Sequence, residues 1–149
     1  MIDQELVDRK LLLITKDLEG LAALARLELD AFLANAANQV LAERYLERLV
    51  GRMIDVNFHL LTETGHPPPA DYYQSFLELC PAGVYDAEFS RRVATCAGLR
   101  NRIAHEYDDL DPAKLHEATR AALVDVPRYI RHVIDWLSQH HGVDPSGDH

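Results

Sequence analysis

The sequence predicts an all-α protein, an up-and-down bundle of four main helices with short helical turns between them. Apolar residues recur at helical spacing in long stretches, and turn-forming segments such as "TGHPPP" and "PAGVYD" separate these stretches. No stretch has the alternating pattern of a β-strand. With 149 residues, 48% of them hydrophobic, the chain can bury the core of one domain. We expect that domain to span residues 1–139 and residues 140–149 to form a flexible tail.

Two long helices are expected in the first half of the chain. The first has apolar residues that step by four, three, four, three and four positions: Val7, Leu11, Ile14, Leu18, Leu21 and Ala25. The second should run from about Asn38 to about Thr64, with an apolar stripe at Leu46, Leu49, Met53, Val56 and Leu60. Residues 27–38 should hold a short helical turn and a corner between the two.

Three consecutive prolines, Pro67 to Pro69, should end the second long helix, because proline cannot continue a helix. Asp71 is a suitable N-cap for a short helix within "DYYQSFLELC". A further main helix is expected from about Ala87 to near Ala104.

The last helix should begin at Asp111, an N-cap, with Pro112 at the first helical position, where its missing N–H costs nothing. Its buried stripe should be Leu115, Ala118, Ala122, Val126, Tyr129, Val133 and Trp136. Pro127 should interrupt and bend this helix, because it removes one backbone hydrogen bond and crowds the preceding turn.

The charge of the chain limits its partners and its location. A formal net charge of -9 opposes any broad attraction to nucleic acid or to an anionic membrane, so contact with a polyanion must be local. No signal or transit peptide is visible, and no apolar run approaches the roughly 20 residues that span a bilayer. We expect a cytoplasmic protein with no membrane partner.

Neither a metal site nor a cofactor is expected. Cys80 and Cys96 form no CxxC motif, and both are predicted to be reduced core residues. His59 and His132 should be interface or core residues rather than ligands. Five other histidines are expected to be exposed, and none has a Cys or carboxylate neighbour at metal-binding spacing: His66, His116, His140, His141 and His149.

The segment "GLRNRIAHEYDDLDP", residues 98–112, is the candidate functional site. Arg100 and His105 would point about 140° apart on a continuous helix. A helix that ended near Ile103 or Ala104 would let His105 turn back toward the helix end. Arg can hold a phosphate through two N–H groups, and His transfers protons near neutral pH, so the pair could cleave RNA without a metal ion. A two-fold dimer would supply two of each residue.

The order Arg100, four residues, His105, one residue, Tyr107 resembles the R-x-x-x-x-H-x-Y signature of HEPN-domain toxins of the HepT type. The resemblance covers nearly the whole chain and extends the expected fold to a HEPN-type bundle. It implies a homodimer with a ribonuclease site at its interface, in which Arg100 and His105 are catalytic. Asn101, the polar residue of the motif, and the neighbouring Arg102 would orient the substrate.

The resemblance also implies a partner and a mode of control. The partner would be a minimal nucleotidyltransferase antitoxin of the MntA type, which transfers AMP to the motif tyrosine, here Tyr107. The substrate would be tRNA or mRNA, cut without metal to leave a 2',3'-cyclic phosphate. An AMP group beside Arg100 and His105 would block the cleft and compete for its positive charge.

Local charges around the motif are mixed. An RNA groove could be lined by Arg91, Arg92, Arg100 and Arg102. The loop that follows is acidic, and it could cap the last helix or contact a basic patch on the antitoxin: Glu106, Asp108, Asp109 and Asp111. Tyr72 and Tyr73 could stack on bases, although core packing is the favoured interpretation.

Structural interpretations of the same residues remain open. Arg100 and His105 could brace the end of a helix, and Tyr107 could be a buried packing residue with a satisfied hydroxyl. At the level of function, the alternatives to a ribonuclease toxin are a non-catalytic HEPN module that binds nucleotide or a nucleotidyltransferase partner, and a purely structural helical dimer.

Overall fold

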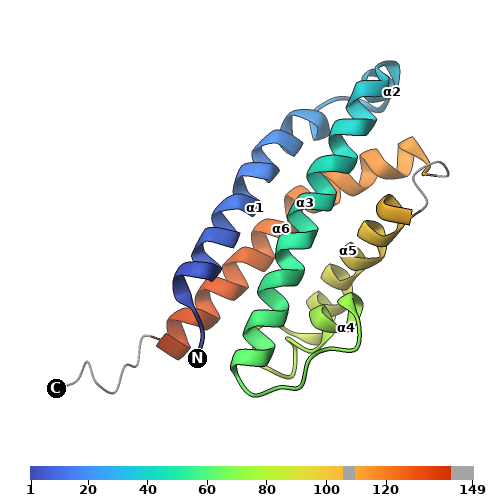
Figure 1. Ribbon diagram of the computed structural model, residues 1–149. Helices are drawn as coiled ribbons and strands as arrows, with labels where there is room; N and C mark the ends of the chain where they lie inside the picture. Colours follow the sequence, from blue (N-terminus) through green and yellow to red (C-terminus); the bar gives the residue numbers. More distant parts are fainter. Residues whose placement is uncertain (106–109, 142–149) are drawn as a thin grey trace.

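The computed structural model describes residues 1–105 and 110–141, and over these residues it contains helices and no strand (Figure 1). The helices are α1 (Gln4–Ala25), α2 (Leu29–Ala34), α3 (Ala36–Glu63), α4 (Tyr72–Leu77), α5 (Ala87–His105) and α6 (Pro112–His141). The long helices α1, α3, α5 and α6 alternate in direction, whereas α2 and α4 have six residues each. The expected all-α, HEPN-type bundle of four main helices with short helical turns is confirmed.

The two longest helices of the first half, α1 and α3, lie side by side and form the most extensive helix pair (Figure 1). The Asp3 carboxylate accepts a hydrogen bond from the Leu6 N–H at 3.1 Å and caps α1, and Asn35 caps α3 in the same way. All residues of both predicted apolar stripes are buried. At Gly20 the helices come so close that an added Cβ would lie 2.4 Å from Cζ of Tyr45, and the tyrosine ring would have to move.

A small polar network inside the core ties α3, α4 and α6 together. The hydroxyl of the fully buried Tyr129 donates to Oδ1 of Asn57, and Nδ2 of Asn57 donates to Oγ of Ser75 at 3.1 Å. Burial raises the pKa of Tyr129, so this hydroxyl stays a donor. Buried polar groups need such partners, and the network fixes how the three helices pack.

The helix α5 packs mainly on α3 and α4 and contacts α6 only sparsely. It begins after Asp86, whose carboxylate accepts a hydrogen bond from the Phe89 N–H at 2.8 Å. It continues to His105, one residue beyond the predicted end near Ala104, so the predicted bounds of this helix are confirmed and His105 is itself helical. No glycine or proline follows Gly98 until Pro112, so no helix-breaking residue ends the helix before His105.

His116 was expected at the surface, but it is buried with 5% exposure. Its Nε2 lies 2.7 Å from the Leu27 carbonyl oxygen, and its ring lies 4.9 Å from that of Phe32. Arg120 also donates to the Leu27 carbonyl, through a terminal guanidinium nitrogen at 3.0 Å. Carbonyl groups at the end of a helix lack hydrogen-bond partners within that helix. Here side chains of α6 supply such partners to a carbonyl that follows the end of α1.

The last helix differs from expectation at two points. Asp111 and Pro112 begin it as predicted, and the Asp111 carboxylate accepts a hydrogen bond from the Ala113 N–H at 2.9 Å. The helix then continues through Pro127 without the predicted interruption. It also includes residues 140 and 141, which were assigned to the tail. Residues 142–149, the rest of the expected tail, lie outside the described residues. Within the described part of the chain, no helix combines the length and apolar character needed to cross a membrane.

Candidate active site

The motif residues of α5 project in different directions, because α5 is a single helix from Ala87 to His105. At about 100° per residue, Arg100 and His105 point about 140° apart, and Arg102 points about 160° away from Arg100. Asn101 lies within about 40° of His105 on the helix surface. Arg100 and His105 of one chain therefore do not converge, and the expected turn of His105 back toward Arg100 is not formed.

Arg100 points toward α3 and lies beside an aromatic ring. Its Cζ is 5.3 Å from the ring centroid of Tyr72, a cation–π contact, and its Nε is buried with no hydrogen-bond partner among the described residues. The favoured expectation that Tyr72 and Tyr73 pack in the core is wrong, since they are 41% and 44% exposed. The ring of Tyr72 instead packs edge-on against the ring of Phe58, with the two ring centroids 6.2 Å apart, and it forms an aromatic surface next to Arg100.

A hollow of about 650 Å³ surrounds the Arg100 side chain on the outer face of α3, and we call it the Arg100 pocket. Figure 1 shows α3 between α1 on one side and α5 with α4 on the other. The charged residues that line the pocket are four cations and two carboxylates: Lys10, Arg48, Arg52, Arg100, Glu47 and Asp55. In a chain of net charge -9 this is a local concentration of positive charge.

Ion pairs hold the pocket cations in place. Asp17, only 4% exposed, lies 3.4 Å from a terminal nitrogen of Arg48 and also pairs with Arg52. On the α1 side, Nζ of Lys10 lies 2.8 Å from Oδ2 of Asp55. One buried carboxylate thus positions two guanidinium groups at the floor of the pocket, which reduces the conformational freedom that they would lose on binding an anion.

His105 and Asn101 are exposed and lie on the same face of α5, away from the Arg100 pocket. His105 is the final residue of α5, at the end of the bundle where α6 begins (Figure 1). Both side chains are open to a second molecule. The site residues named from the sequence therefore divide into an Arg100 side and a His105 side.

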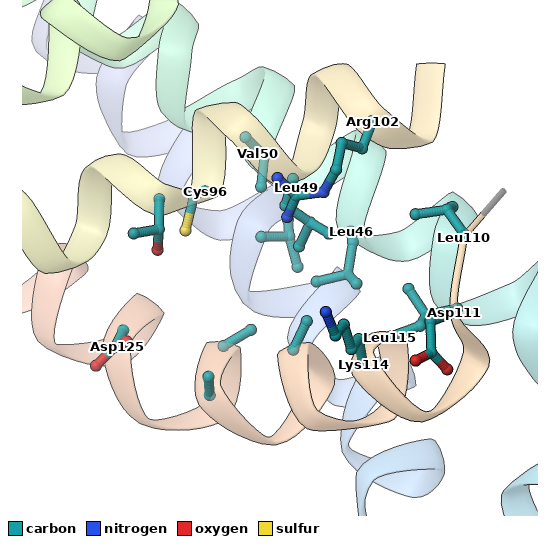
Figure 2. A pocket seen from close by; sticks show the side chains of 15 residues that line it. Leu46, Leu49, Val50, Cys96, Arg102, Leu110, Asp111, Lys114, Leu115 and Asp125 are labelled. Carbon is teal, nitrogen blue, oxygen red and sulfur yellow. The ribbon is translucent and has the colours of Figure 1, made fainter. Parts of the chain in front are cut away.

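Arg102 lies on a third side of α5, in an apolar groove between α5 and α6 (Figure 2). This α5–α6 groove has a volume of about 580 Å³, and α3 forms its floor through Leu46, Leu49 and Val50. Arg102 of α5 and Lys114 of α6 reach into it from opposite walls (Figure 2). Arg102 is thus separated from Arg100, with which it was expected to act.

The α5–α6 groove also contains the thiol of Cys96, which points toward α6 (Figure 2). Burial raises the pKa of this thiol to about 12, and the negative charge of Asp125 adds to the effect. Cys80 and Cys96 are both free, and both are half-buried against the core rather than within it as predicted. The thiol of Cys96 is protonated at neutral pH and takes no part in an ion pair.

The four arginines of α5 do not form the single RNA-binding stripe that was expected. Nε of Arg92 lies 2.8 Å from Oδ1 of Asp125 on α6, so this arginine is paired within the bundle. Arg91 is exposed, Arg100 lies in the Arg100 pocket and Arg102 lies in the α5–α6 groove. Spacing along α5 distributes them around the helix, because 3.6 residues make a turn.

Tyr107, the expected modification site, and the acidic residues 106, 108 and 109 lie outside the described residues. Asp111, the last acid of that loop, caps α6. Among the residues that the structure describes, no three His, Cys, Asp or Glu side chains gather as metal ligands would.

Sequence reasoning missed the residues that surround Arg100. Arg48 and Arg52 are four residues apart and share one face of α3, a spacing that could have indicated a cationic site. Lys10 and Tyr72 gave no such signal, because only the packing of α1 and α4 around α3 brings them to the pocket. They come from segments far apart in the sequence.

Comparison with known proteins agrees with this fold. Residues 14–133 match the family described as "Ribonuclease HepT-like". The tRNA nuclease HepT of Aphanizomenon flos-aquae (strain 2012/KM1/D3) is 31% identical over 136 residues, which cover 91% of this chain and 92% of the relative. Among solved structures, YutE of Bacillus subtilis, a cytosolic protein of unknown function, gives a TM-score of 0.77 over 96% of each chain at 16% identity. That likeness shows the fold alone.

The fold and the motif define an all-α bundle of the HEPN type with a polar Arg–His segment on its α5 helix. The chain belongs to the HepT-like ribonuclease family. Membership of this family supports a ribonuclease function for the chain.

Proposed function

We propose that this protein is the toxin of a HEPN/MNT toxin–antitoxin system, a cytoplasmic endoribonuclease that cuts RNA without a metal ion. Two observations support the proposal. The chain belongs to a ribonuclease family, and a relative with 31% identity is named a tRNA nuclease, so tRNA is the first substrate to examine and mRNA the second. The motif residues Arg100 and His105 are the chemically suitable groups on α5.

The observation that carries the architecture of the site is the continuity of α5. Arg100 and His105 point about 140° apart, so a single chain cannot place both on one phosphodiester. A two-fold dimer that pairs the ends of α5 would bring Arg100 of one protomer toward His105 of the other, and it would place two copies of each residue in one cleft. The exposed His105 and Asn101 are available for such a pairing.

The chemistry follows from these groups. His105 of one protomer takes the proton of a ribose 2'-hydroxyl, and the 2'-oxygen attacks the adjacent phosphorus. His105 of the partner subunit, protonated, gives a proton to the departing 5'-oxygen. Arg100 donates hydrogen bonds to the phosphate oxygens as their charge grows, and Asn101 orients the substrate. The products are a 2',3'-cyclic phosphate and a 5'-hydroxyl end, and no metal ion takes part.

Control would come from an MntA-type nucleotidyltransferase antitoxin that transfers AMP to Tyr107. Tyr107 is two residues beyond His105 in the sequence, so the modified side chain would be close to the catalytic histidine. The added phosphate would form an ion pair with the guanidinium of Arg100, and the added nucleoside would fill the cleft.

A cleavage assay in EDTA tests the ribonuclease. Purified protein is incubated with total tRNA, and the 3' ends of the products are analysed for the cyclic phosphate. His105→Ala should lower the rate by about 10² to 10⁴, the usual contribution of a general acid–base group. His140→Ala is the matched control, because His140 is exposed near the far end of α6 and should leave the rate unchanged. Intact RNA with well-folded wild-type protein would favour the non-catalytic HEPN module.

Intact-mass measurement tests the modification. Incubation with ATP and an MntA-type nucleotidyltransferase should raise the mass by one or more AMP units and abolish cleavage. Tyr107→Phe should not gain this mass. Equal AMP uptake by Tyr107→Phe would show that another residue is modified.

A further inference from the structure

Gly51 lies on the floor of the Arg100 pocket, and the packing of this chain does not require a glycine there. A Cβ added at Gly51 would meet nothing within 4 Å, whereas one added at Gly20 would overlap Tyr45. Glycine inside a helix is destabilising relative to alanine, so a bare position in α3 has a cost without a packing benefit. Its use would be to let the backbone of another molecule approach the helix closely.

The charges around Gly51 favour an anion as that molecule. Arg48 and Arg52 share one carboxylate, Asp17, and their side chains remain 41% and 21% exposed. Each guanidinium has five N–H donors in a planar fork, so a single carboxylate leaves donors free on both. Phosphate oxygens match such forks, and the two arginines are already held in position by Asp17.

The aromatic wall of the pocket indicates which kind of phosphate fits. Tyr72 is 41% exposed, and the guanidinium of Arg100 lies 5.3 Å from its ring centroid. Unpaired RNA bases stack on tyrosine rings and on the guanidinium planes of arginines, whereas inorganic phosphate has no aromatic surface with which to stack. A hollow of about 650 Å³ has room for a nucleotide. Phosphate-binding cations beside an exposed ring therefore fit one nucleotide of single-stranded RNA.

We propose that the Arg100 pocket is a subsite for the nucleotide next to the scissile phosphate. Its phosphate binds Arg48 and Arg52, its sugar–phosphate backbone passes over Gly51, and its base stacks on Tyr72. The inference rests on the proposed ribonuclease function, because Arg100 is shared between this pocket and the cleavage site. It also defines the substrate class: RNA that is cut in a loop or single-stranded segment, with an unstacked base beside the cut.

Equilibrium binding tests the subsite separately from cleavage. The parent is His105→Ala, which should bind RNA without cutting it, and the probe is a fluorescent single-stranded RNA whose anisotropy is followed in EDTA at several salt concentrations. Arg48→Gln should weaken binding and lower the slope of log Kd against log salt by about 0.7, the value for one phosphate contact. Arg48 is the arginine to change because Arg52 remains to pair with Asp17. Arg131→Gln, an exposed arginine of α6 that lines neither hollow, should bind like the parent.

Two further variants in the same parent examine the ring and the bare helix surface. Tyr72→Ala should weaken binding at least about fivefold, whereas Tyr72→Phe keeps the ring and should bind like the parent. Gly51→Met fills the floor and should weaken binding, whereas Gly51→Ala adds one methyl group to open space and should weaken it far less.

Several results would overturn the subsite. They are parent-like affinity and salt slope in Arg48→Gln, Gly51→Met and Tyr72→Ala, or a parent that does not bind RNA. A change of oligomeric state in RNA-free Gly51→Met, seen by light scattering, would instead assign this face to a protein contact. The two proposals fail differently. Cleavage by wild type with parent-like binding by the variants rejects only the subsite, whereas residue-dependent binding without cleavage by wild type rejects the ribonuclease and leaves the Arg100 pocket as an RNA-binding site with no scissile phosphate beside it.

Discussion

On one side of α5 the Arg100 pocket is lined by four cations and two carboxylates, whereas on another side the α5–α6 groove is lined mainly by aliphatic side chains with balanced charges. Arg100 and Arg102 are two residues apart in sequence and lie in these two different environments. The floor of both hollows is α3: Gly51 is bare on the pocket side, and Leu49 is fully buried on the groove side. The pocket is therefore suited to a polar ligand, whereas the floor of the groove belongs to the protein core.

The largest expected difference concerns thiol reactivity in the groove. In a Cys80→Ser variant, Cys96 is the remaining thiol, and its pKa rises from about 9 to about 12 on folding. The thiolate fraction at pH 8 should fall about a thousandfold, and alkylation by iodoacetamide should slow at least about tenfold relative to the urea-unfolded chain, because the more basic thiolate is also the stronger nucleophile. Comparable rates in the folded and unfolded chain would show that the groove is not apolar around this thiol.

The same shift has a defined effect on stability. Because the folded pKa of Cys96 is the higher one, its contribution is fully present below about pH 9 and is lost as the pH rises toward 12. Urea unfolding at pH 8 and pH 10.5 should show the loss, and the loss should be smaller in Cys96→Ala. An equal pH dependence in both proteins would assign the effect to other groups.

Next in size is the contrast between the two floors. Leu49→Ala should lower the free energy of unfolding by about 2 to 5 kcal/mol, because a fully buried leucine leaves a cavity. Gly51→Ala should raise the free energy of unfolding by about 0.5 to 1 kcal/mol, because the methyl group enters open space and glycine weakens a helix. Urea denaturation followed by circular dichroism measures both. Destabilisation by Gly51→Ala would mean that α3 needs the glycine for its own packing.

The smallest expected effect is a gain in binding. Asp55 is 56% exposed in its side chain and pairs with Lys10 at the rim of the Arg100 pocket. Asp55→Asn removes a negative charge and frees Lys10, so it should tighten RNA binding about two- to fivefold at low salt. Stability should change by less than about 1 kcal/mol, as is usual for an exposed ion pair. Asp135→Asn, an exposed acid of α6, is the charge-matched control, and equal tightening by both variants would indicate only a net-charge effect.

Most of the fold could be predicted because it depends on local signals. The stripes that begin at Val7 and Leu46 follow helical spacing, and side chains of the expected caps Asp71 and Asp111 bond to backbone N–H groups two or three residues on. His116 was mispredicted because its burial depends on the Leu27 carbonyl, which lies 89 positions away in sequence. Tertiary contacts of this kind leave no periodic trace.

The site could be predicted only as far as its motif. Arg100 and His105 were identified by their residue types and order, whereas the pocket around Arg100 uses α1, α3 and α4 as well. The predicted end of α5, near Ala104, agrees with the structure, in which His105 is the last helical residue. Because His105 is still helical, its side chain points about 140° away from that of Arg100, and the sequence alone left this orientation open. The continuous helix is the reason that the proposed site requires two chains.

Mixed dimers provide the most direct test of that requirement. Wild-type and His105→Ala chains with different affinity tags are co-expressed, and dimers that contain one of each are purified over both tags and assayed on tRNA in EDTA. If the two histidines act as acid and base in one shared cleft, these dimers should lose about 100-fold or more of the wild-type rate. A mixed dimer with His140→Ala should keep the full rate. A mixed dimer that retains about half of the activity, or a monomer that is fully active, would contradict a shared site.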